Sequence, residues 1–324
     1  MAELERRVLR GWEVLDLSSE AITVTVIPAL GGALWSLTRR ADAAELFWTP
    51  PWGLPPYGAA GLAAGAEAAT VTTRGGWQTL FPNAGDSVTV HGVEWGSDGE
   101  ARLTQLDWEF TGSSLVMNGR LVRAPFTLTR TVSLRGPELS VGETVRNVGG
   151  ERLGTMWGSQ LLLGGALLGD DTVVDTAATI VRPDPAFSPS ASYDDLSPWP
   201  RAHGRHSMVN LRNVPGADAA ESRLAYLSDL TRPWLRVSRP SRQLGFDLEW
   251  DGARWPHLWY RLEAGGKAGF PWYRRGYFLE LTPCSSWPAH GLHTASRVAD
   301  SVLSIPEDGT RTAYATLTVH PTDS

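Results

Sequence analysis

Cysteine is almost absent from this chain, which has a single such residue, Cys284, among its 324. One cysteine excludes an intramolecular disulfide framework and a metal cluster built on cysteines, and the default role of such a thiol is a buried, silent one. Long apolar stretches are missing too: residues 1–7 hold no apolar signal segment, and no run approaches the length that crosses a membrane. We therefore expect a cytoplasmic protein with no membrane partner.

Excess positive charge is also missing. The chain carries 29 Lys and Arg against 35 Asp and Glu, a net charge of −6, and no block of basic residues stands out. The arginines within 120–135 come closest, but they occur at strand-like spacing. Because nucleic-acid binding normally requires a basic patch, we expect no nucleic-acid partner. The sequence leaves the oligomeric state open.

Strand patterns dominate what is present. Apolar residues make up 42% of the chain, which suits a substantial core. Short alternating segments end at Gly, Pro or Asn, whereas convincing amphipathic helices are scarce. This punctuation indicates an all-β sandwich or barrel. The clearest expected strands are 21–27, 114–121, 126–134 and 139–145.

The chain reads as one domain, residues 1–324. Segment 183–212 is rich in Pro, Ser and Asp, but strand patterns resume on both sides of it, so we interpret it as a long excursion between strands. No internal repeat or low-complexity tract is evident. Segment 59–69 is rich in Ala and Gly and suits one helical turn or a flexible loop over a cleft.

The most informative run is residues 75–86, Gly-Gly-Trp-Gln-Thr-Leu-Phe-Pro-Asn-Ala-Gly-Asp. Paired glycines let a backbone approach a ligand closely. Gln78, Asn83 and Asp86 carry hydrogen-bonding groups of the kind that hold sugar hydroxyls. Taken alone, the run also suits an ordinary Gly-Pro turn between two strands.

Other segments set this run in a wider context. Glu280 lies in Tyr-Phe-Leu-Glu-Leu-Thr-Pro, and further matching pieces are 27–32, 130–147, 156–160 and 275–288. Their order over roughly 250 residues resembles the aldose 1-epimerase (mutarotase) superfamily. The resemblance implies a large twisted antiparallel β-sandwich, the galactose mutarotase-like supersandwich, and a sugar ligand. We expect no cofactor and no metal.

The chemistry implied by the resemblance is the interconversion of sugar anomers. A base takes the proton of the anomeric hydroxyl and an acid protonates the ring oxygen, so the ring opens and closes again. Glu280 matches the position of the catalytic base, and a strand holds such a carboxylate accurately. The alternative for Glu280 is a solvent-facing carboxylate or a salt bridge to Arg274 or Arg275.

The residues available for the general-acid role depart from the family pattern. Histidines are expected at two places, which here read Ser97-Asp98-Gly99-Glu100 and Ser159-Gln160. Asp98 can donate a proton only if burial or a neighbouring carboxylate such as Glu280 raises its pKa. His91-Gly92 precedes this region but looks like a hairpin turn.

Several side chains are candidates for holding the ligand. Arg74 precedes the paired glycines, where sugar-phosphate mutarotases place a comparable arginine, so an anionic or phosphorylated sugar is an open alternative. Gln160 can orient a hydroxyl but cannot transfer a proton. Most of the fifteen tryptophans belong in a core, but Trp77, Trp157 and Trp272 adjoin motif residues and are candidates for stacking on a sugar.

The remaining histidines offer weaker alternatives. His203 and His206 lack acidic partners for a metal site. His290 and His293 follow Pro288 and are further candidates for the missing acid. The loss of both family histidines also leaves open a sugar-binding or sensor protein without catalysis, or an isomerase or lyase of a modified or acidic sugar using Asp98 or Tyr273.

Overall fold

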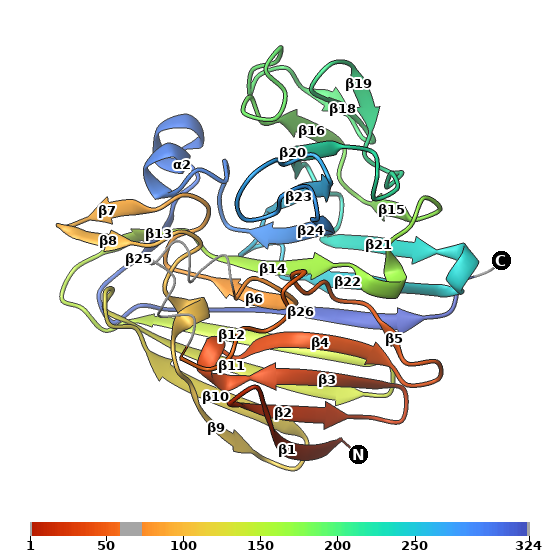
Figure 1. The fold of residues 1–324 in the computed structure, drawn as a ribbon. Coiled ribbons are helices and arrows are strands. Elements are labelled where there is room, and N and C mark those ends of the chain that lie inside the picture. Colours follow the sequence, from red (N-terminus) through yellow and green to blue (C-terminus); the bar gives the residue numbers. More distant parts are fainter. Residues whose placement is uncertain (1, 59–72, 323–324) are drawn as a thin grey trace.

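The structure is a computed structural model that describes residues 2–58 and 73–322. Segment 59–69, expected to form a turn or a loop over a cleft, lies outside the described residues. Two large antiparallel sheets are stacked on each other, and the all-β sandwich predicted from the sequence is confirmed (Figure 1). Within the described residues, the larger sheet has twelve strands and the smaller one eight.

The larger sheet crosses the front of Figure 1 and follows the order β1-β2-β3-β4-β6-β14-β24-β23-β20-β16-β17, with β5 paired to β4. Its strands are β1 (Glu3–Leu9), β2 (Trp12–Ser18), β3 (Ile22–Ile27), β4 (Ala33–Arg39), β5 (Ala44–Glu45), β6 (Trp77–Leu80), β14 (Gly158–Leu163), β16 (Ile180–Pro183), β17 (Ser197–Pro198), β20 (Glu221–Ser228), β23 (His257–Ala264) and β24 (Tyr277–Cys284).

The smaller sheet lies behind it in the order β15-β21-β22-β26-β12-β11-β10-β9. Its strands are β9 (Asp107–Phe110), β10 (Ser114–Arg120), β11 (Phe126–Arg135), β12 (Glu138–Asn147), β15 (Val173–Thr176), β21 (Trp234–Arg239), β22 (Leu244–Trp250) and β26 (Thr310–His320). The expected strands 114–121, 126–134 and 139–145 correspond to β10, β11 and β12.

The core lies between the two sheets because side chains alternate along each strand. Strand β11 shows this alternation over its whole length, with Phe126, Leu128 and Val132 fully buried. Polar side chains also cross between the sheets: Thr79 Oγ1 of β6 donates to Glu143 Oε1 of β12 at 2.6 Å. The face of β6 that carries Thr79 therefore points to the core, and the opposite face points away from it.

Several short elements lie outside the two large sheets. The expected turn at His91-Gly92 joins β7 (Val88–Val90) to β8 (Val93–Trp95), and His91 has a φ of 47°. Segment 183–212, predicted to be a long excursion between strands, pairs with the larger sheet again at the short strand β17 and contains the hairpin of β18 (Arg201–His203) and β19 (Met208–Asn210). The other elements are β13 (Leu153–Thr155), β25 (Leu303–Ile305), α2 (Leu292–Ala299), and the 3-10 helices η1 (Pro28–Leu30), η3 (Ala101–Leu103), η4 (Gly165–Leu167) and η5 (Pro240–Arg242).

In the part of the chain that the structure describes, no helix is both long and apolar enough to cross a membrane.

Candidate functional site

Four neighbouring strands place polar side chains on the outer face of the larger sheet. The register sets Gln160 of β14 opposite Gln78 of β6, and Arg261 of β23 opposite Glu280 of β24. Leu162 of β14 also lies opposite Glu280, so all of these residues share the face that points away from the smaller sheet. The sheet thus gathers its polar groups at one place near the middle of its strand order.

Glu280 lies at the centre of this group and is only 2% exposed. Its carboxylate accepts hydrogen bonds from Arg74 Nη2 at 2.7 Å and from Gln160 Nε2 at 2.9 Å. Arg261 Nη1 lies 3.9 Å from Glu280 Oε2. Burial favours the neutral acid, but the charges of Arg74 and Arg261, with these hydrogen bonds, outweigh burial and lower the pKa of Glu280. The carboxyl group is therefore ionised at neutral pH, as a base must be.

Arg74 lies between two carboxylates instead of facing solvent. It is 8% exposed, and its Nη1 lies 3.5 Å from Asp98 Oδ2 while Nη2 binds Glu280. Burial opposes its charge, but Glu280 and Asp98 overcome this and raise the pKa of Arg74. A neighbouring Glu280 was one of the two conditions under which Asp98 can act as the acid. In the structure the Arg74 guanidinium stands between the two carboxyl groups.

Asp98 is fixed by further donors. Its Oδ1 accepts from the Gly85 backbone N–H at 3.0 Å, and its Oδ2 accepts from Arg102 Nη1 at 3.2 Å. Arg102 is fully buried, donates to Gln78 Oε1 at 2.6 Å, and has a pKa lowered to about 10 by burial. Hydrogen-bond donors therefore hold both oxygens of the Asp98 carboxyl group, and the Arg102 contact gives Gln78 a supporting role beneath the site.

The paired glycines determine how the Arg74 segment passes β4. Gly76 has a φ of +62°, and a Cβ there would lie 1.9 Å from the Leu34 carbonyl oxygen. Its backbone N–H donates to the Trp48 carbonyl at 2.9 Å. Only glycine fits such a left-handed position against another backbone. The close backbone approach expected of this motif is thus made to β4.

Asn83 and Asp86 shape the loop that follows. Asn83 is fully buried, and among the residues that the structure describes its amide binds only backbone groups, donating to the Asp86 and Gly96 carbonyls and accepting from the Leu292 N–H. Asn83 is therefore a loop support rather than a ligand contact. The Asp86 side chain is exposed, with Oδ2 lying 3.1 Å from His290 Nδ1.

His290 takes part in a series of polar contacts that could not be predicted from the sequence. Its Nε2 lies 2.7 Å from Asp184 Oδ2, which also accepts from Tyr226 Oη at 2.5 Å. Hydrogen bonds to Asp184 and Asp86 raise the pKa of His290 to about 10, so the imidazole is charged at neutral pH. A cationic imidazole between two carboxylates connects the segments around 86, 184 and 290.

The tryptophan candidates divide between core and site. Trp157 is fully buried, and its Nε1 donates to Glu143 Oε2 at 2.9 Å. Trp77 is likewise buried and donates to Ser159 Oγ. Both belong to the core, which corrects the expectation that they stack on a sugar, since neither has a surface to offer.

Trp272 lies on the site face. It packs against Phe278, which precedes Glu280 by two residues, with ring centroids 5.4 Å apart, and against Trp48 at 5.3 Å. Leu162 completes this buried cluster, and Trp52 stacks on Trp272 at its edge. An apolar aromatic wall therefore adjoins the Glu280 group, although Trp272 itself is only 3% exposed.

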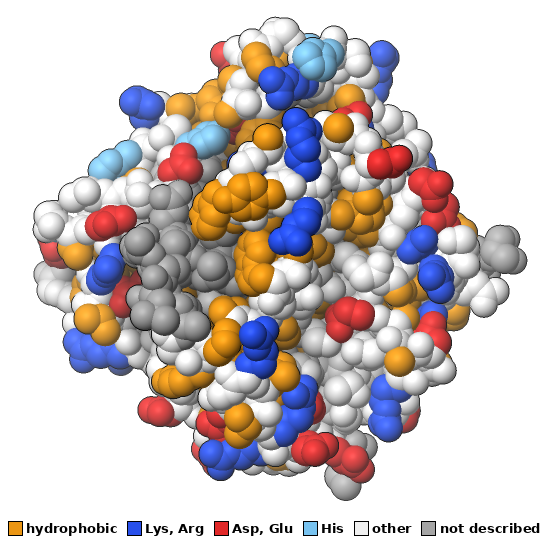
Figure 2. Space-filling view, viewed as in Figure 1, with side chains coloured by type: hydrophobic (Ala, Val, Ile, Leu, Met, Phe, Trp, Pro, Cys, Tyr) orange, Lys and Arg blue, Asp and Glu red, His pale blue; other side chains and the backbone are white. Residues whose placement is uncertain are grey.

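Two polar atoms beside Glu280 have no hydrogen-bond partner among the described residues: Gln160 Oε1 and Arg74 Nε. Buried polar atoms are normally paired, and a water molecule or a ligand that donates to Gln160 Oε1 and accepts from Arg74 Nε would satisfy both. Around this region, Figure 2 shows Lys and Arg side chains among hydrophobic ones over β23 and β24.

Sequence reasoning placed Glu280, Arg74, Gln160 and Asp98 together, and the structure brings these four into one group. It missed Arg261 and Arg102, because nothing in the local sequence shows which strand partner faces Glu280 or which arginine is buried beneath the loop. His290 was considered only by its position after Pro288.

No protein-family model matches the sequence, and no curated protein matches it significantly. Solved structures do. A Klebsiella pneumoniae protein assigned provisionally as an aldose 1-epimerase superimposes with a TM-score of 0.75 at 14% identity, over 98% of this chain and 83% of that one. A galactose mutarotase-like protein from Lactobacillus casei gives a TM-score of 0.67 at 17% identity, over 95% and 100% of the two chains.

A galactose mutarotase-like protein from Clostridium acetobutylicum agrees over 99% of both chains, with a TM-score of 0.69 at 10% identity. The protein therefore has the galactose mutarotase-like fold. The fold expected from the ordered motifs is thus confirmed.

Proposed function

We propose that the protein binds a sugar on the outer face of its larger sheet and interconverts its anomers as an aldose 1-epimerase does. The observation that carries this proposal is the Glu280 carboxylate, ionised and held by Arg74 and Gln160 beside the aromatic wall of Trp272. An ionised carboxylate fixed on a strand suits removal of the anomeric proton. The neighbouring unpartnered atoms suit sugar hydroxyls, and the wall suits the C–H face of the ring.

In this mechanism Glu280 takes the proton of the anomeric hydroxyl, and Arg74 keeps the carboxylate charged and oriented. Glu280 is nearly covered, so the sugar must displace part of the Arg74 contact to reach it. Asp98 stays the candidate for protonating the ring oxygen. Its present partners are all donors, so it serves as an acid only after Arg74 moves away from it. We accordingly expect slow turnover, because a missing general acid costs about 10²–10⁴ in rate.

The ion pair of Arg74 and Glu280 also favours a second function, sugar binding without catalysis. A base neutralised by a contact of 2.7 Å is a weaker base, and pure binding requires only the polar group and the aromatic wall.

Two-dimensional exchange NMR of glucose and galactose anomers, extended to a panel of aldoses, tests the first function. We expect exchange above the spontaneous rate that falls to that rate in Glu280→Gln. Glu249→Gln, at an exposed carboxylate on β22, is the matched control. Equal exchange in wild type and Glu280→Gln refutes Glu280 as base. Binding without accelerated exchange of any aldose supports the second function instead.

A further inference from the structure

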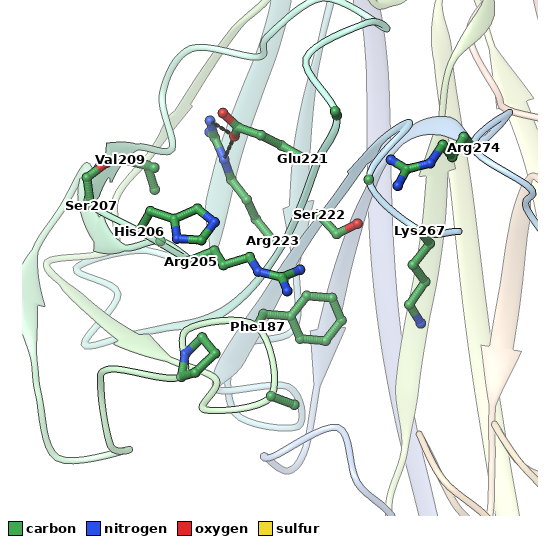
Figure 3. A pocket seen from close by; sticks show the side chains of 15 residues that line it. Phe187, Arg205, His206, Ser207, Val209, Glu221, Ser222, Arg223, Lys267 and Arg274 are labelled. Atoms are coloured by element: carbon green, nitrogen blue, oxygen red, sulfur yellow. Dashed lines mark hydrogen bonds and ion pairs between the residues drawn. The ribbon is translucent and has the colours of Figure 1, made fainter. Parts of the chain in front are cut away.

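A cavity of about 610 Å³ opens beside the hairpin of β18 and β19. It lies between this hairpin, the start of β20, the loop that follows β16 and the connection from β23 to β24. Its volume is in the range of small-molecule sites and far exceeds that of a single inorganic ion. The lining side chains that carry the argument are Phe187, Arg205, Ser222, Arg223, Lys267 and Arg274 (Figure 3).

The cavity is cationic in a chain of net charge −6. Its lining includes one carboxylate, Glu221, which accepts from Arg223 Nε at 2.7 Å and is thereby matched. Arg205, Lys267 and Arg274 have no carboxylate within ion-pair distance among residues 2–58 and 73–322. Positive charges without an ion-pair partner inside one cavity favour the binding of an anion.

These charges converge from separate segments. In Figure 3, Arg205 reaches in from the hairpin and Arg274 from the opposite side, with Ser222 between them and Lys267 alongside Arg274. Phe187 offers an aromatic face below Arg205, and the Lys267 ammonium lies 5.8 Å from the centroid of its ring. A cavity with cations at its sides and an aromatic face suits a ligand with both an anionic group and apolar C–H surface.

The cavity adjoins the Glu280 group on the same sheet face. The backbone N–H of Lys267 donates to Glu263 Oε1 at 2.8 Å, and Glu263 follows Arg261 by two residues on β23. Partial burial and the positive charges of Arg261 and Arg74 lower the pKa of Lys267, against the opposing charge of Glu263. The contact of the Lys267 backbone with Glu263 places this edge of the cavity next to the strand that carries Arg261.

We propose that this cavity is the subsite for an anionic substituent, carboxylate or phosphate, of the sugar that binds beside Glu280. The placement of the ligand across both regions rests on the proposed function, whereas anion binding by the cavity does not. Arg74 was the expected anchor for an anionic sugar. Its charge is already matched by Glu280 and Asp98, so the unpaired cations of Arg205, Lys267 and Arg274 take that role.

Titration calorimetry with glucose 6-phosphate, glucuronate and glucose tests the subsite. We expect at least one anionic sugar to bind about tenfold or more tightly than glucose, because a charge-assisted hydrogen bond contributes about that factor. Arg205→Gln and Arg274→Gln should each remove most of this preference and leave glucose affinity unchanged. Both side chains are exposed, so neither change should unfold the protein. Arg242→Gln, at an exposed arginine outside the cavity, is the control.

The two anionic sugars distinguish a phosphate from a carboxylate. If the binding of glucose 6-phosphate depends on Arg205 and Arg274, the cavity accepts a phosphate, and if the binding of glucuronate does, it accepts a carboxylate. Equal affinity for glucose and both anionic sugars overturns the proposal. So does an anion preference that Arg205→Gln and Arg274→Gln leave as intact as Arg242→Gln does.

Glu280→Gln separates this proposal from the catalytic one. If the wild type accelerates no anomer exchange but shows an anion preference that persists in Glu280→Gln, the subsite is supported and the epimerase function is refuted. Accelerated exchange without any anion preference does the reverse.

Discussion

Replacing Glu280 by glutamine should destabilise the protein mainly by leaving arginines unmatched. Glu280 is 2% exposed and Arg74 8%, so water screens their 2.7 Å contact very little. Removing one partner of a buried ion pair typically lowers the free energy of unfolding by about 3–5 kcal/mol. Arg74 keeps Asp98 at 3.5 Å as a second counter-charge, which places the expected loss at the low end, about 3 kcal/mol.

A double-mutant cycle isolates this pair. Arg74→Gln alone should also cost about 3 kcal/mol, because it leaves a buried carboxylate short of its nearest cation. The double variant should lose about 3 kcal/mol as well, rather than the roughly 6 kcal/mol of independent effects, because it removes both charges together. Urea unfolding at pH 7 measures these differences, with Glu249→Gln as control. Additive losses would show that the two residues are not coupled.

The same variant makes a pH test. The pKa of Glu280 in the folded protein is lowered, since the charges of Arg74 and Arg261 outweigh burial. Its stabilisation is therefore complete above the unfolded pKa of about 4.3 and is lost as pH falls through the folded pKa. The stability gap between wild type and Glu280→Gln should shrink at acidic pH. A gap that widens below pH 4 contradicts the assignment of an ionised Glu280.

Further predictions concern His290, the two tryptophans Trp157 and Trp272, and Asp98. His290→Gln should lower the unfolding temperature at pH 7. Because the folded pKa of His290 is raised to about 10, its stabilisation is complete below about pH 6.5 and is lost as pH rises through 10. The difference in unfolding temperature should therefore disappear near pH 10, and a constant difference from pH 6 to 10.5 contradicts a charged His290 held between Asp86 and Asp184. Trp157→Phe should lower the free energy of unfolding by about 1–3 kcal/mol, because Glu143 Oε2 loses a hydrogen-bond donor, and should leave the sugar affinity measured by calorimetry unchanged. Trp272→Ala should weaken sugar binding in the same measurement. Polarimetry of fresh α-glucose and α-galactose from pH 5 to 8 should show slow mutarotation that Asp98→Asn slows further; fast mutarotation unaffected by Asp98→Asn means that another residue donates the proton.

Much of the fold was readable because strand signals are local. The alternation in 126–134 and the Gly-Pro ending at 136–137 specify one strand and its turn without reference to the rest of the chain. The turn at His91-Gly92 was readable for the same reason. Helix α2 was not foreseen, because eight residues after a glycine give little helical signal.

The site was readable in part, because its position depends on pairing as well as on motifs. The motif order was enough to group Glu280, Arg74, Gln160 and Asp98. Which face a side chain occupies depends on strand register, and so the burial of Trp157 against Glu143 and the placement of Arg261 opposite Glu280 could not be derived from spacing. The ion pairing of Arg74 was equally hidden, since its partners lie far away in the sequence.

The backbone contact at Gly76 has a consequence for how this chain can diverge. Leu34 belongs to β4 near the N-terminus, and its carbonyl oxygen leaves no space for any side chain at position 76. Related proteins can replace Gly76 only if β4 shifts at the same time, so the two segments must drift together during evolution. At Gly150, where an added Cβ meets no atom of residues 2–58 or 73–322 within 4 Å, substitutions can accumulate independently. A random-mutagenesis library sorted for folded protein should therefore retain glycine at 76 and vary freely at 150.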